Sequence, residues 1–534
     1  MIKSHLQVYQ SSTSRYSSSP LFRVPEVCSS TGNVQEWTAI TYQQFSDDVE
    51  RYARYWSKVL RERGIPRRSV IGLWLSGLTY IDCIHIYGMS RAGYTPQMFS
   101  LRLPNPDVVY ELLRKADAKA LVYDSCFESV LSGCSIPAYQ ALKTRNIESV
   151  HEELEEIGPV QNENDAAFIF HTSGSTSGSP KLVPCSYRWL NTVVQKSNFL
   201  TRPRNPDRQD VTVFIGSMSH IAQTFMFLGT LQHGSCVIQP TKMPYTSEEL
   251  IDMIHRCGLN RLNAFGSWLG MHLKNSRQDP KLLSLLIGLD DVLYSGLAIS
   301  REEEQWAIKN GIRIRNLFGS TEVGGMLISG GHEKNPALLQ RLPGVAYEFV
   351  PISSGNTEVV HQSSAALYEL VILAHSPDCP DVSLRGADGH LHTGDLFQEV
   401  TPGWYVSRGR DDDWIKSETS LRCDTKAIED NARAMCGGLI AECVVVGSGR
   451  PSPVMFIEPT GADMDHDKLK KEIIRKTRQF HSRRYLHERI TSPNMVVVVP
   501  RGTLPRTATK GNIRRKAVEE AFASDLDRIF GRSI

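Results

Sequence analysis

Phe168-Ile-Phe-His-Thr-Ser-Gly-Ser-Thr-Ser-Gly-Ser-Pro-Lys181 is the stretch around which the rest of this sequence is organised. An apolar strand runs into hydroxyl side chains and glycines, and the segment closes with Pro-Lys. Gly174 and Gly178 let the backbone approach a ligand closely, and exposed amide groups can form an anion-binding nest. The pattern predicts a loop that holds triphosphate oxygens, with Lys181 adding positive charge. The hydroxyl donors are Thr172, Ser173, Ser175 and Thr176.

Two observations bear on this interpretation. Ser179-Pro180 precedes the lysine, where a Walker loop has glycine, so the segment is not a Walker motif. A flexible surface loop rich in serine and glycine remains the competing interpretation.

Outward from this loop, apolar strands alternate with helices, which predicts parallel, doubly wound α/β layers. A helical pattern over 41–63 ends at Gly64-Ile65-Pro66. The further elements expected before the loop are a strand at 69–75, helices at 80–92 and 108–116, and a strand at 120–123. After it come apolar segments at 211–215, 226–231 and 235–238, and a helix at 247–257.

A polar stretch rich in Gly and Asp, 408–413, predicts a domain boundary, with one domain over 1–411 and a second over 412–534. The second domain is expected to be a small α+β unit. Its expected strands are 441–447, 454–457 and 495–499, and its expected helices are 467–478 and 514–523.

Composition excludes several classes of protein. Lys and Arg number 60 against 58 Asp and Glu, a net charge of +2, so no basic field favours nucleic-acid binding. The 11 cysteines show no metal-ligand spacing, which indicates reduced thiols in a cytoplasmic compartment. No apolar run reaches the roughly 20 residues of a membrane span. Neither a signal peptide at the start nor a peroxisomal ending is expected.

Four further segments carry chemistry. In Asn316-Leu-Phe-Gly-Ser-Thr-Glu-Val-Gly-Gly325, Glu322 is an oxygen donor suited to Mg²⁺ and Thr321 can bond a phosphate. In His392-Thr-Gly-Asp395, the carboxylate can accept two hydrogen bonds from a ribose diol. Taken alone, the Glu322 segment is a weak signal, because a turn with one acidic residue is common. For Asp395 alone, a capping Asp in a turn is the more frequent explanation.

The last two segments lie in or near the small domain. Gly409-Arg-Asp-Asp-Asp-Trp-Ile-Lys416 offers Arg410 to the ribose, although an isolated charge run is usually a solvated linker. Leu504-Pro-Arg-Thr-Ala-Thr-Lys-Gly-Asn-Ile-Arg-Arg515 places Lys510 in a turn just before a helix. There the ammonium could meet negative charge developing on a phosphate.

In this order and at these intervals, the five motifs resemble the acyl-adenylate-forming family of acyl-CoA synthetases, peptide-synthetase adenylation domains and luciferases. The resemblance runs from Thr38-Ala-Ile-Thr-Tyr-Gln-Gln-Phe45 to Arg515, and includes Tyr294-Ser-Gly-Leu-Ala-Ile-Ser300. Ser420-Leu-Arg-Cys-Asp-Thr-Lys-Ala-Ile-Glu429 is most similar to fungal stand-alone and peptide-synthetase-like members.

The resemblance implies a large N-terminal part, with two doubly wound α/β subdomains and a distorted β-barrel, and a small mobile α+β domain. ATP and Mg²⁺ are the implied cofactors, and coenzyme A or phosphopantetheine the implied acyl acceptor. The implied ATP-binding residues are Thr172, Ser173, Gly174, Ser175, Thr176, Gly178, Lys181, Phe318, Gly319, Ser320, Thr321, Asp395 and Arg410.

Other roles follow from the same resemblance. Lys510 would stabilise the adenylation transition state, Glu322 would ligate Mg²⁺, Asp412 would be the hinge, and Lys416 would face the site during thiol transfer. The implied pocket residues are His220, Phe265, Gly266, Trp268, Ser295, Gly296, Gly324 and Met326.

The sequence departs from the family pattern in three places. The phosphate loop is one residue longer, because Ser177 precedes Gly178. The glycine expected after Lys416 is absent, and Thr419 stands near its place. The usual Gly-Lys pair near the end appears reversed, as Lys510-Gly511.

The acid is expected to be apolar, aryl or short-chain, rather than an α-amino acid. Between Val211 and Pro240 there is no Asp or Glu to pair with an α-ammonium group, and burying that charge unpaired is costly. His220 stands there instead, near the expected carboxylate, although a core histidine with satisfied nitrogens explains it equally well. Asp290 or Asp291 could still reach the ligand.

Three other functions compete with a free-standing ligase. One is a nucleotide-binding module without catalysis, which predicts that Glu322 or Lys510 is missing, and both are present. Another is an excised domain of a peptide-synthetase-like enzyme or carboxylic acid reductase. The larger enzyme would be expected to have a carrier motif after the small domain, and this sequence contains none there. A luciferase-like oxygenase is the third. An acyl carrier protein is a possible partner.

Overall fold

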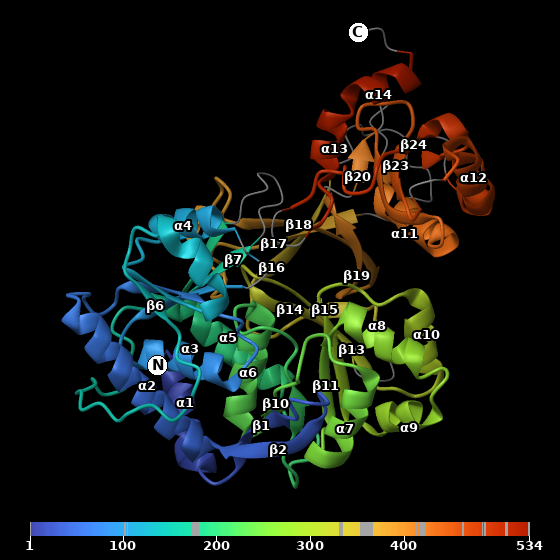
Figure 1. Cartoon of the computed structure of the whole chain (residues 1–534). Coiled ribbons are helices and arrows are strands. Elements are labelled where there is room, and N and C mark those ends of the chain that lie inside the picture. The colour runs from blue at the N-terminus through green and yellow to red at the C-terminus, as the bar shows by residue number, and fades with distance from the viewer. Residues whose placement is uncertain are drawn as a thin grey trace.

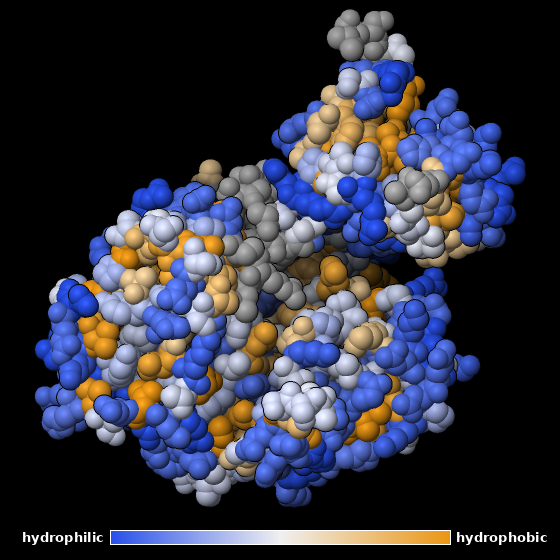
Figure 2. Space-filling model, viewed as in Figure 1, coloured by the Kyte–Doolittle hydropathy of each residue, from blue (hydrophilic) through white to orange (hydrophobic). Residues whose placement is uncertain are grey.

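The structure is a computed structural model. It describes residues 2–100, 103, 105–172, 181–330, 335–352, 367–411, 414–416, 422–461, 464–482, 484, 488–507 and 511–531. A large N-terminal part carries a small C-terminal domain at one end (Figure 1). Figure 2 shows a hollow between the small domain and the large part, with hydrophobic side chains in its floor. Among the described helices, none is long and apolar enough to cross a membrane.

The first α/β layer is a six-stranded sheet in the order β6-β5-β3-β4-β7-β8, parallel except for β8. Its strands are β3 (Val70–Trp74), β4 (Thr95–Phe99), β5 (Ala120–Tyr123), β6 (Ala138–Gln140), β7 (Ala166–Thr172) and β8 (Lys181–Ser186). The helices of this layer are α2 (Tyr42–Glu62), α3 (Tyr80–Arg91), α4 (Pro106–Lys115) and α5 (Tyr187–Leu200).

The two ends of helix α2 are marked by residues that the sequence makes recognisable. Thr41 is its N-cap: its hydroxyl accepts from the amide of Gln44 at 3.1 Å, and the Gln44 side chain accepts from the Thr41 amide at 2.9 Å. This capping box fixes the start of the helix. Gly64, with φ of +72°, turns the chain just beyond its end.

The second α/β layer contains a four-stranded sheet, β2-β1-β10-β9, and the parallel half of a nine-stranded sheet, β11-β12-β13. Its strands are β1 (Pro20–Val27), β2 (Val34–Thr41), β9 (Val211–Val213), β10 (Cys236–Ile238), β11 (Arg261–Phe265), β12 (Asp291–Ser295) and β13 (Ile314–Ser320). Its helices are α6 (Ile221–His233), α7 (Ser247–Cys257), α8 (Gly266–Asn275), α9 (Pro280–Gly288) and α10 (Arg301–Lys309). The apolar segment 226–231 lies inside α6.

The other half of the nine-stranded sheet is antiparallel and curls around one apolar cluster, which corresponds to the expected distorted barrel (Figure 1). Its strands are β14 (Gly324–Ser329), β15 (Leu339–Arg341), β16 (Tyr347–Pro351), β17 (Leu367–Ile372), β18 (Leu391–Thr401) and β19 (Trp404–Arg410). Val323, Tyr347 and Phe397 are among the side chains at its centre.

The small C-terminal domain has its own apolar clusters on both faces of a three-stranded sheet. Its strands are β20 (Trp414–Lys416), β21 (Arg422–Asp424), β22 (Ile440–Val446), β23 (Val454–Pro459) and β24 (Val496–Val498). Its helices are α11 (Thr425–Cys436), α12 (His466–Ser482), α13 (Arg515–Ala521) and α14 (Ala523–Ile529). The expected α/β fold with a small α+β domain is confirmed. Short 3₁₀ helices lie at Ser125–Gly133, Val382–Leu384 and Pro493–Met495.

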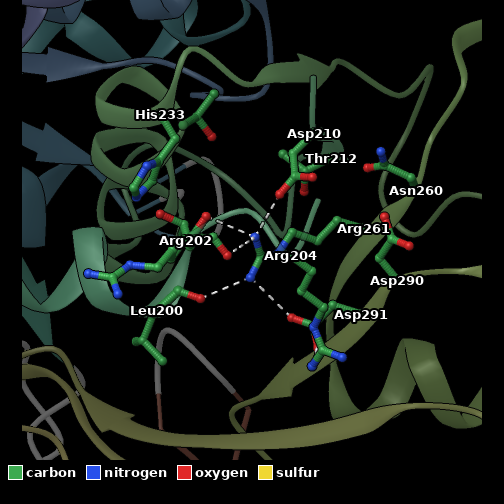
Figure 3. Close-up of polar contacts among 12 residues, drawn as sticks. Leu200, Arg202, Arg204, Asp210, Thr212, His233, Asn260, Arg261, Asp290 and Asp291 are labelled. Carbon is green, nitrogen blue, oxygen red and sulfur yellow. Dashed lines mark hydrogen bonds and ion pairs between the residues drawn. The ribbon is translucent and has the colours of Figure 1, made fainter. Parts of the chain in front are cut away.

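A buried arginine ties together the amino ends of the parallel strands in the second layer (Figure 3). Arg261, the first residue of β11, donates to Asp210 at 2.8 Å and to Asp291, the first residue of β12, at 3.2 Å. The same guanidinium caps the carbonyl groups of Leu200 and Thr201, at 2.9 and 2.8 Å.

The pKa values of the two aspartates are shifted in opposite directions. Burial raises the pKa of Asp210, and this outweighs the opposing effect of Arg261. Burial would also raise the pKa of Asp291, but Arg315, Arg261 and Arg204 together hold it below its usual value. The negative charge of Asp291 is therefore better balanced by neighbouring arginines than that of Asp210.

We expect Arg261→Met to destabilise the large domain strongly, by about 3–5 kcal/mol. The change removes the arginine that pairs with the buried Asp210, one of the three arginines around Asp291, and the donor to the carbonyl groups of Leu200 and Thr201. Thermal unfolding followed by circular dichroism measures the effect. Arg475→Met, which removes an exposed arginine paired with Glu472 on α12, is the control and should leave the unfolding temperature where it was. Equal, small shifts in the two variants would contradict a structural role for Arg261.

Candidate active site

The two ends of the expected phosphate loop lie side by side at the edge of the first sheet. Strands β7 and β8 form an antiparallel pair in which Thr172 faces Lys181. Thr172 is half-buried and Lys181 is exposed. The other predicted loop residues, Ser173, Gly174, Ser175, Thr176 and Gly178, lie outside the described residues. The structure thus fixes where the loop begins and ends.

A half-buried histidine just before this loop contacts the neighbouring strand β4. His171 stacks on Phe99, with ring centroids 4.4 Å apart. Its Nδ1 lies 3.0 Å from the carbonyl oxygen of Met98, and its Nε2 lies 3.0 Å from the side-chain nitrogen of Gln97. Burial lowers the pKa of His171 to about 4. The neutral ring therefore donates through Nδ1 and accepts through Nε2, which holds β7 against β4.

Glu322 lies in the short turn between β13 and β14, beside the strand that leaves the phosphate loop. Cys185 on β8 has a pKa well above its usual value, first because it is buried and second because Glu322 is near. Trp189, in the first turn of α5, donates from Nε1 to the carbonyl oxygen of Glu322 at 3.0 Å. The second and first motifs of the sequence are thus brought together.

The turn at Glu322 depends on glycine. Gly324 has φ of +74°, and a Cβ on Gly319 would lie 2.5 Å from the carbonyl oxygen of Gly324. Phe318, before the turn, packs edge to face with Phe397 at 5.2 Å. Ser320 and Thr321 are half-buried, and the buried Oγ of Ser320 has no hydrogen-bond partner among the residues that the structure describes.

Asp395 and Arg410 are cross-strand partners on β18 and β19. The guanidinium donates to the Asp395 carboxylate at 3.2 Å and to the carbonyl oxygen of Thr393 at 3.2 Å. Gly394 has φ of +68°, and a Cβ there would lie 3.2 Å from the Arg410 guanidinium. The two residues assigned to ribose are therefore bonded to each other, and Gly394 leaves room for the Arg410 guanidinium.

Most of the predicted pocket residues gather at the carboxyl ends of β11 and β12. Phe265 and Ser295 are neighbours in the parallel register, and ligands of open α/β sheets bind at such ends. The Phe265 ring meets His220 edge to face at 5.3 Å and Trp268 at 5.1 Å. Gly296 makes room, because a Cβ there would lie 3.2 Å from the ring.

Three further pocket residues have backbone roles or lie elsewhere. Gly266 begins α8, where a Cβ would lie 1.9 Å from the carbonyl oxygen of Leu297. Gly324 packs against Phe225, its Cβ position 3.4 Å from that ring. Met326 stands opposite a register shift between β13 and β14 and is fully buried in the barrel cluster, not in the Phe265 group.

His220 has a local structural role as well as a place beside Phe265. It is the N-cap residue of α6, and its Nδ1 accepts from the amide of Ala222 at 3.1 Å. This bond fixes Nδ1 as an acceptor and therefore directs the ring proton to Nε2. The ring is half-buried.

Asp290 and Asp291, the acids that could have reached the ligand, lie at the other end of the sheet. Asp291 begins β12 and Ser295 ends it, which puts their backbones roughly 13 Å apart. Asp291 is paired with Arg261, Arg204 and Arg315 (Figure 3).

In the small domain, Lys510 and Asp412 lie outside the described residues, and of Lys416 only the backbone is described, at the end of β20. The residues on either side of 508–510 are bonded to each other and to the core of the small domain. Thr507 donates its amide to Asn512 at 2.8 Å, and Arg506 bridges the buried Glu458 at 2.9 Å.

Sequence reasoning missed the residues that support this site, above all His171, Gln97, Trp189 and Lys196. Their types give no signal by themselves. Only His171 stands directly next to the phosphate loop in the sequence, and that position is the one signal that could have drawn attention to it.

Comparison with known proteins fits this geometry. The AMP-binding enzyme family matches residues 24–352, and the AMP-binding enzyme C-terminal domain matches residues 412–533. The AMP-binding domain-containing enzyme iboA of Amanita muscaria (strain Koide BX008) is 36% identical over 515 residues, which cover 94% of this chain and 98% of that protein. The adenylate-forming reductase stbB of Stachybotrys bisbyi is 24% identical over 474 residues, 84% of this chain but 41% of the reductase.

Solved structures share the whole fold. O-succinylbenzoate coenzyme A synthetase (MenE) from Bacillus subtilis, in complex with AMP, has a TM-score of 0.75 at 14% identity, covering 96% of this chain and 98% of that one. ATP-bound MatB from Rhodopseudomonas palustris has a TM-score of 0.71 at 16% identity, with coverage of 96% and 98%. The chain therefore belongs to the AMP-binding family of adenylate-forming enzymes, which activate a carboxylic acid with ATP.

Proposed function

We propose that this enzyme joins a small carboxylic acid to AMP and then transfers the acyl group to a thiol. In the first step a carboxylate oxygen attacks the α-phosphorus of ATP, and pyrophosphate leaves. In the second step a thiol sulfur attacks the acyl carbon of the adenylate, and AMP leaves. Two observations support the proposal. The Glu322 turn lies against Cys185 on the strand that leaves the phosphate loop and against Trp189 in the next helix, and the Phe265 group lies at the carboxyl ends of the parallel strands β11 and β12, next to the strand that leads into this turn.

The assignment of the ATP-binding residues follows the positions already described. Residues 172–181 would hold the pyrophosphate end, with Thr172 and Lys181 at its two strand ends. The Asp395 carboxylate, oriented by Arg410, would accept from the ribose hydroxyls. Phe318 and Ser320 would flank the adenine and the acyl group.

The residues around Glu322 are suited to Mg²⁺. This ion is usually bound through one or two carboxylates and the phosphates of its nucleotide, not by a cage of protein ligands. Over the residues that the structure describes, no group of three His, Cys, Asp or Glu side chains could hold a metal. Ser320 adds a buried hydroxyl that bonds to none of the described side chains or backbone groups. When bound, the ion would neutralise phosphate charge, with Glu322 as its protein ligand.

The small domain would act in both steps. Lys510 would lie against the α-phosphate during adenylation, where negative charge develops. Asp412, at the boundary between domains 1–411 and 412–534, would then be the hinge of a rotation that brings Lys416 to the site. The thiol acceptor would be coenzyme A or the phosphopantetheine of an acyl carrier protein, the latter as in an adenylation domain of a larger synthetase.

The pocket favours an acid with an apolar body. His220, Phe265 and Trp268 form an aromatic wall, and small-molecule pockets are lined mainly by such side chains. The distance and the ion pairs of Asp290 and Asp291 leave them unable to receive an α-ammonium group from this position.

ATP–pyrophosphate exchange with a panel of acids tests the proposed substrate class. We expect benzoate-like or short-chain acids to drive exchange better than common α-amino acids, since an ammonium group would be buried without a partner. Adding coenzyme A, or a carrier protein bearing phosphopantetheine, to the same assay identifies the acceptor. Stronger exchange with α-amino acids would overturn this substrate class.

Glu322→Gln tests the metal assignment. The change removes a charged ligand with almost no change in volume, so the Mg²⁺ concentration needed for half-maximal exchange should rise and turnover should fall. The unfolding temperature should hardly change. Glu348→Gln, which neutralises an exposed glutamate on β16, is the matched control. Unfolding of Glu322→Gln, with no change in Mg²⁺ dependence, would make Glu322 a structural residue.

Lys510→Ala separates the two half-reactions. Adenylate formation should slow by about 10²–10³-fold, because one donor to the developing charge is lost. Thioester formation from supplied acyl-adenylate should continue. Lys516→Ala, on the exposed side of the next helix, should affect neither step. Equal losses in both half-reactions of Lys510→Ala would contradict its assignment to adenylation.

A further inference from the structure

Two side chains donate hydrogen bonds to the backbone of the turn that contains Glu322. Trp189 Nε1 donates to the carbonyl oxygen of Glu322 at 3.0 Å. Lys196 Nζ donates to the carbonyl oxygen of the next residue, Val323, at 2.8 Å. Two successive peptide groups of the turn are therefore fixed by direct bonds.

Both side chains come from one face of α5. Trp189 and Lys196 are seven residues apart, which is about two helical turns, and both are buried, at 2% and 1% exposure. Helix α5 starts directly after β8, and its N-cap Ser186 accepts from the Trp189 amide at 3.2 Å. The strand that leaves the phosphate loop thus leads directly into the helix that supports Glu322.

The charge of Lys196 is balanced within the barrel. Asp378 accepts from its ammonium at 2.8 Å, and the two side chains are 1% and 0% exposed. Asp378 also accepts from the hydroxyl of Ser376 at 2.5 Å and from that of Tyr347 on β16. The support of the Glu322 turn is therefore anchored in both the α/β layer and the barrel.

Stability alone does not account for this arrangement. A buried ion pair often stabilises a protein no better than apolar side chains of similar volume. A methionine at position 196 would fill the same space without the cost of burying an ammonium group. What only a hydrogen-bond donor can provide is the bond to the Val323 carbonyl oxygen.

We propose that Trp189 and Lys196 are positioning residues, which orient the Glu322 carboxylate for Mg²⁺ by holding the Glu322–Val323 and Val323–Gly324 peptide groups. This inference rests on the proposed role of Glu322 as a metal ligand. Mg²⁺ demands near-ideal octahedral geometry at 2.0–2.1 Å, so a small rotation of these peptide groups would move the carboxylate out of range. Groups that orient a ligand commonly matter for metal affinity nearly as much as the ligand does.

Metal binding, not turnover, provides the test. Mn²⁺ replaces Mg²⁺, and its affinity for the enzyme in complex with α,β-methylene-ATP is measured by electron paramagnetic resonance. Trp189→Phe removes one donor, and the double variant Lys196→Met/Asp378→Asn removes the other without leaving a charge unpaired. We expect each to weaken Mn²⁺ binding by about ten-fold.

Trp37→Phe is the matched control. Trp37 is also buried, at 5% exposure, and its Nε1 donates to Asp252 at 2.8 Å, away from Glu322. It should leave the Mn²⁺ affinity unchanged, whatever it does to the unfolding temperature.

The remaining outcomes are distinguishable. If Glu322→Gln weakens Mn²⁺ binding while both supporting variants lower only the unfolding temperature, Trp189 and Lys196 are merely structural and this inference is overturned. If Glu322→Gln itself leaves Mn²⁺ binding unchanged, the proposed metal role of Glu322 fails, and the inference fails with it. Should one supporting variant not fold, the other decides alone.

Discussion

The buried ion pair between Lys196 and Asp378 joins three parts of the molecule that are distant in sequence. Its ammonium comes from the helix behind the phosphate loop, its carboxylate from a loop of the barrel, and the carbonyl group it binds from the turn of Glu322. Charges removed from water in this way must remain together, because either one alone would be costly to bury. The relative placement of the α/β layer, the barrel and the turn is therefore constrained at this point.

A second cluster of charges constrains the opposite end of the same layer. Arg261 and the aspartates around it close the amino ends of the strands, whereas the carboxyl ends present Phe265, Ser295 and the Glu322 turn. The charges at the amino ends are internally compensated, while the carboxyl ends carry glycines and partly exposed polar groups. The amino ends of the strands therefore stabilise the fold, whereas the carboxyl ends are suited to binding a ligand.

Local signals in the sequence predicted much of the fold. The helix expected over 247–257 is α7 (Ser247–Cys257), and the one expected over 41–63 is α2, because the Thr41 capping box and Gly64 mark its ends. The order of the motifs also indicated the family. In the barrel the apolar pattern was less informative. Met326, which was expected in the pocket, is fully buried in the barrel cluster and stands opposite a shift of strand register.

What the sequence could not reveal are contacts between distant segments. Lys196 and Asp378 lie 182 positions apart, and a lysine within an apolar helix normally indicates an exposed position. The pairing of Gln97 with His171 spans 74 positions. Likewise, Asp290 and Asp291 remained candidates for the ligand until the strand direction placed them at the far end of the sheet.

The N-terminal segment, for which the sequence predicted no helix, forms helix α1 (His5–Tyr16) beside strand β7. His5 is fully buried and packs 4.4 Å from Phe168, on the strand that ends at Thr172, and 5.6 Å from Tyr87. The helix precedes residue 24, where the family match begins. Trimming a recombinant protein to the limits of that match would therefore expose the side of β7 against which His5 packs.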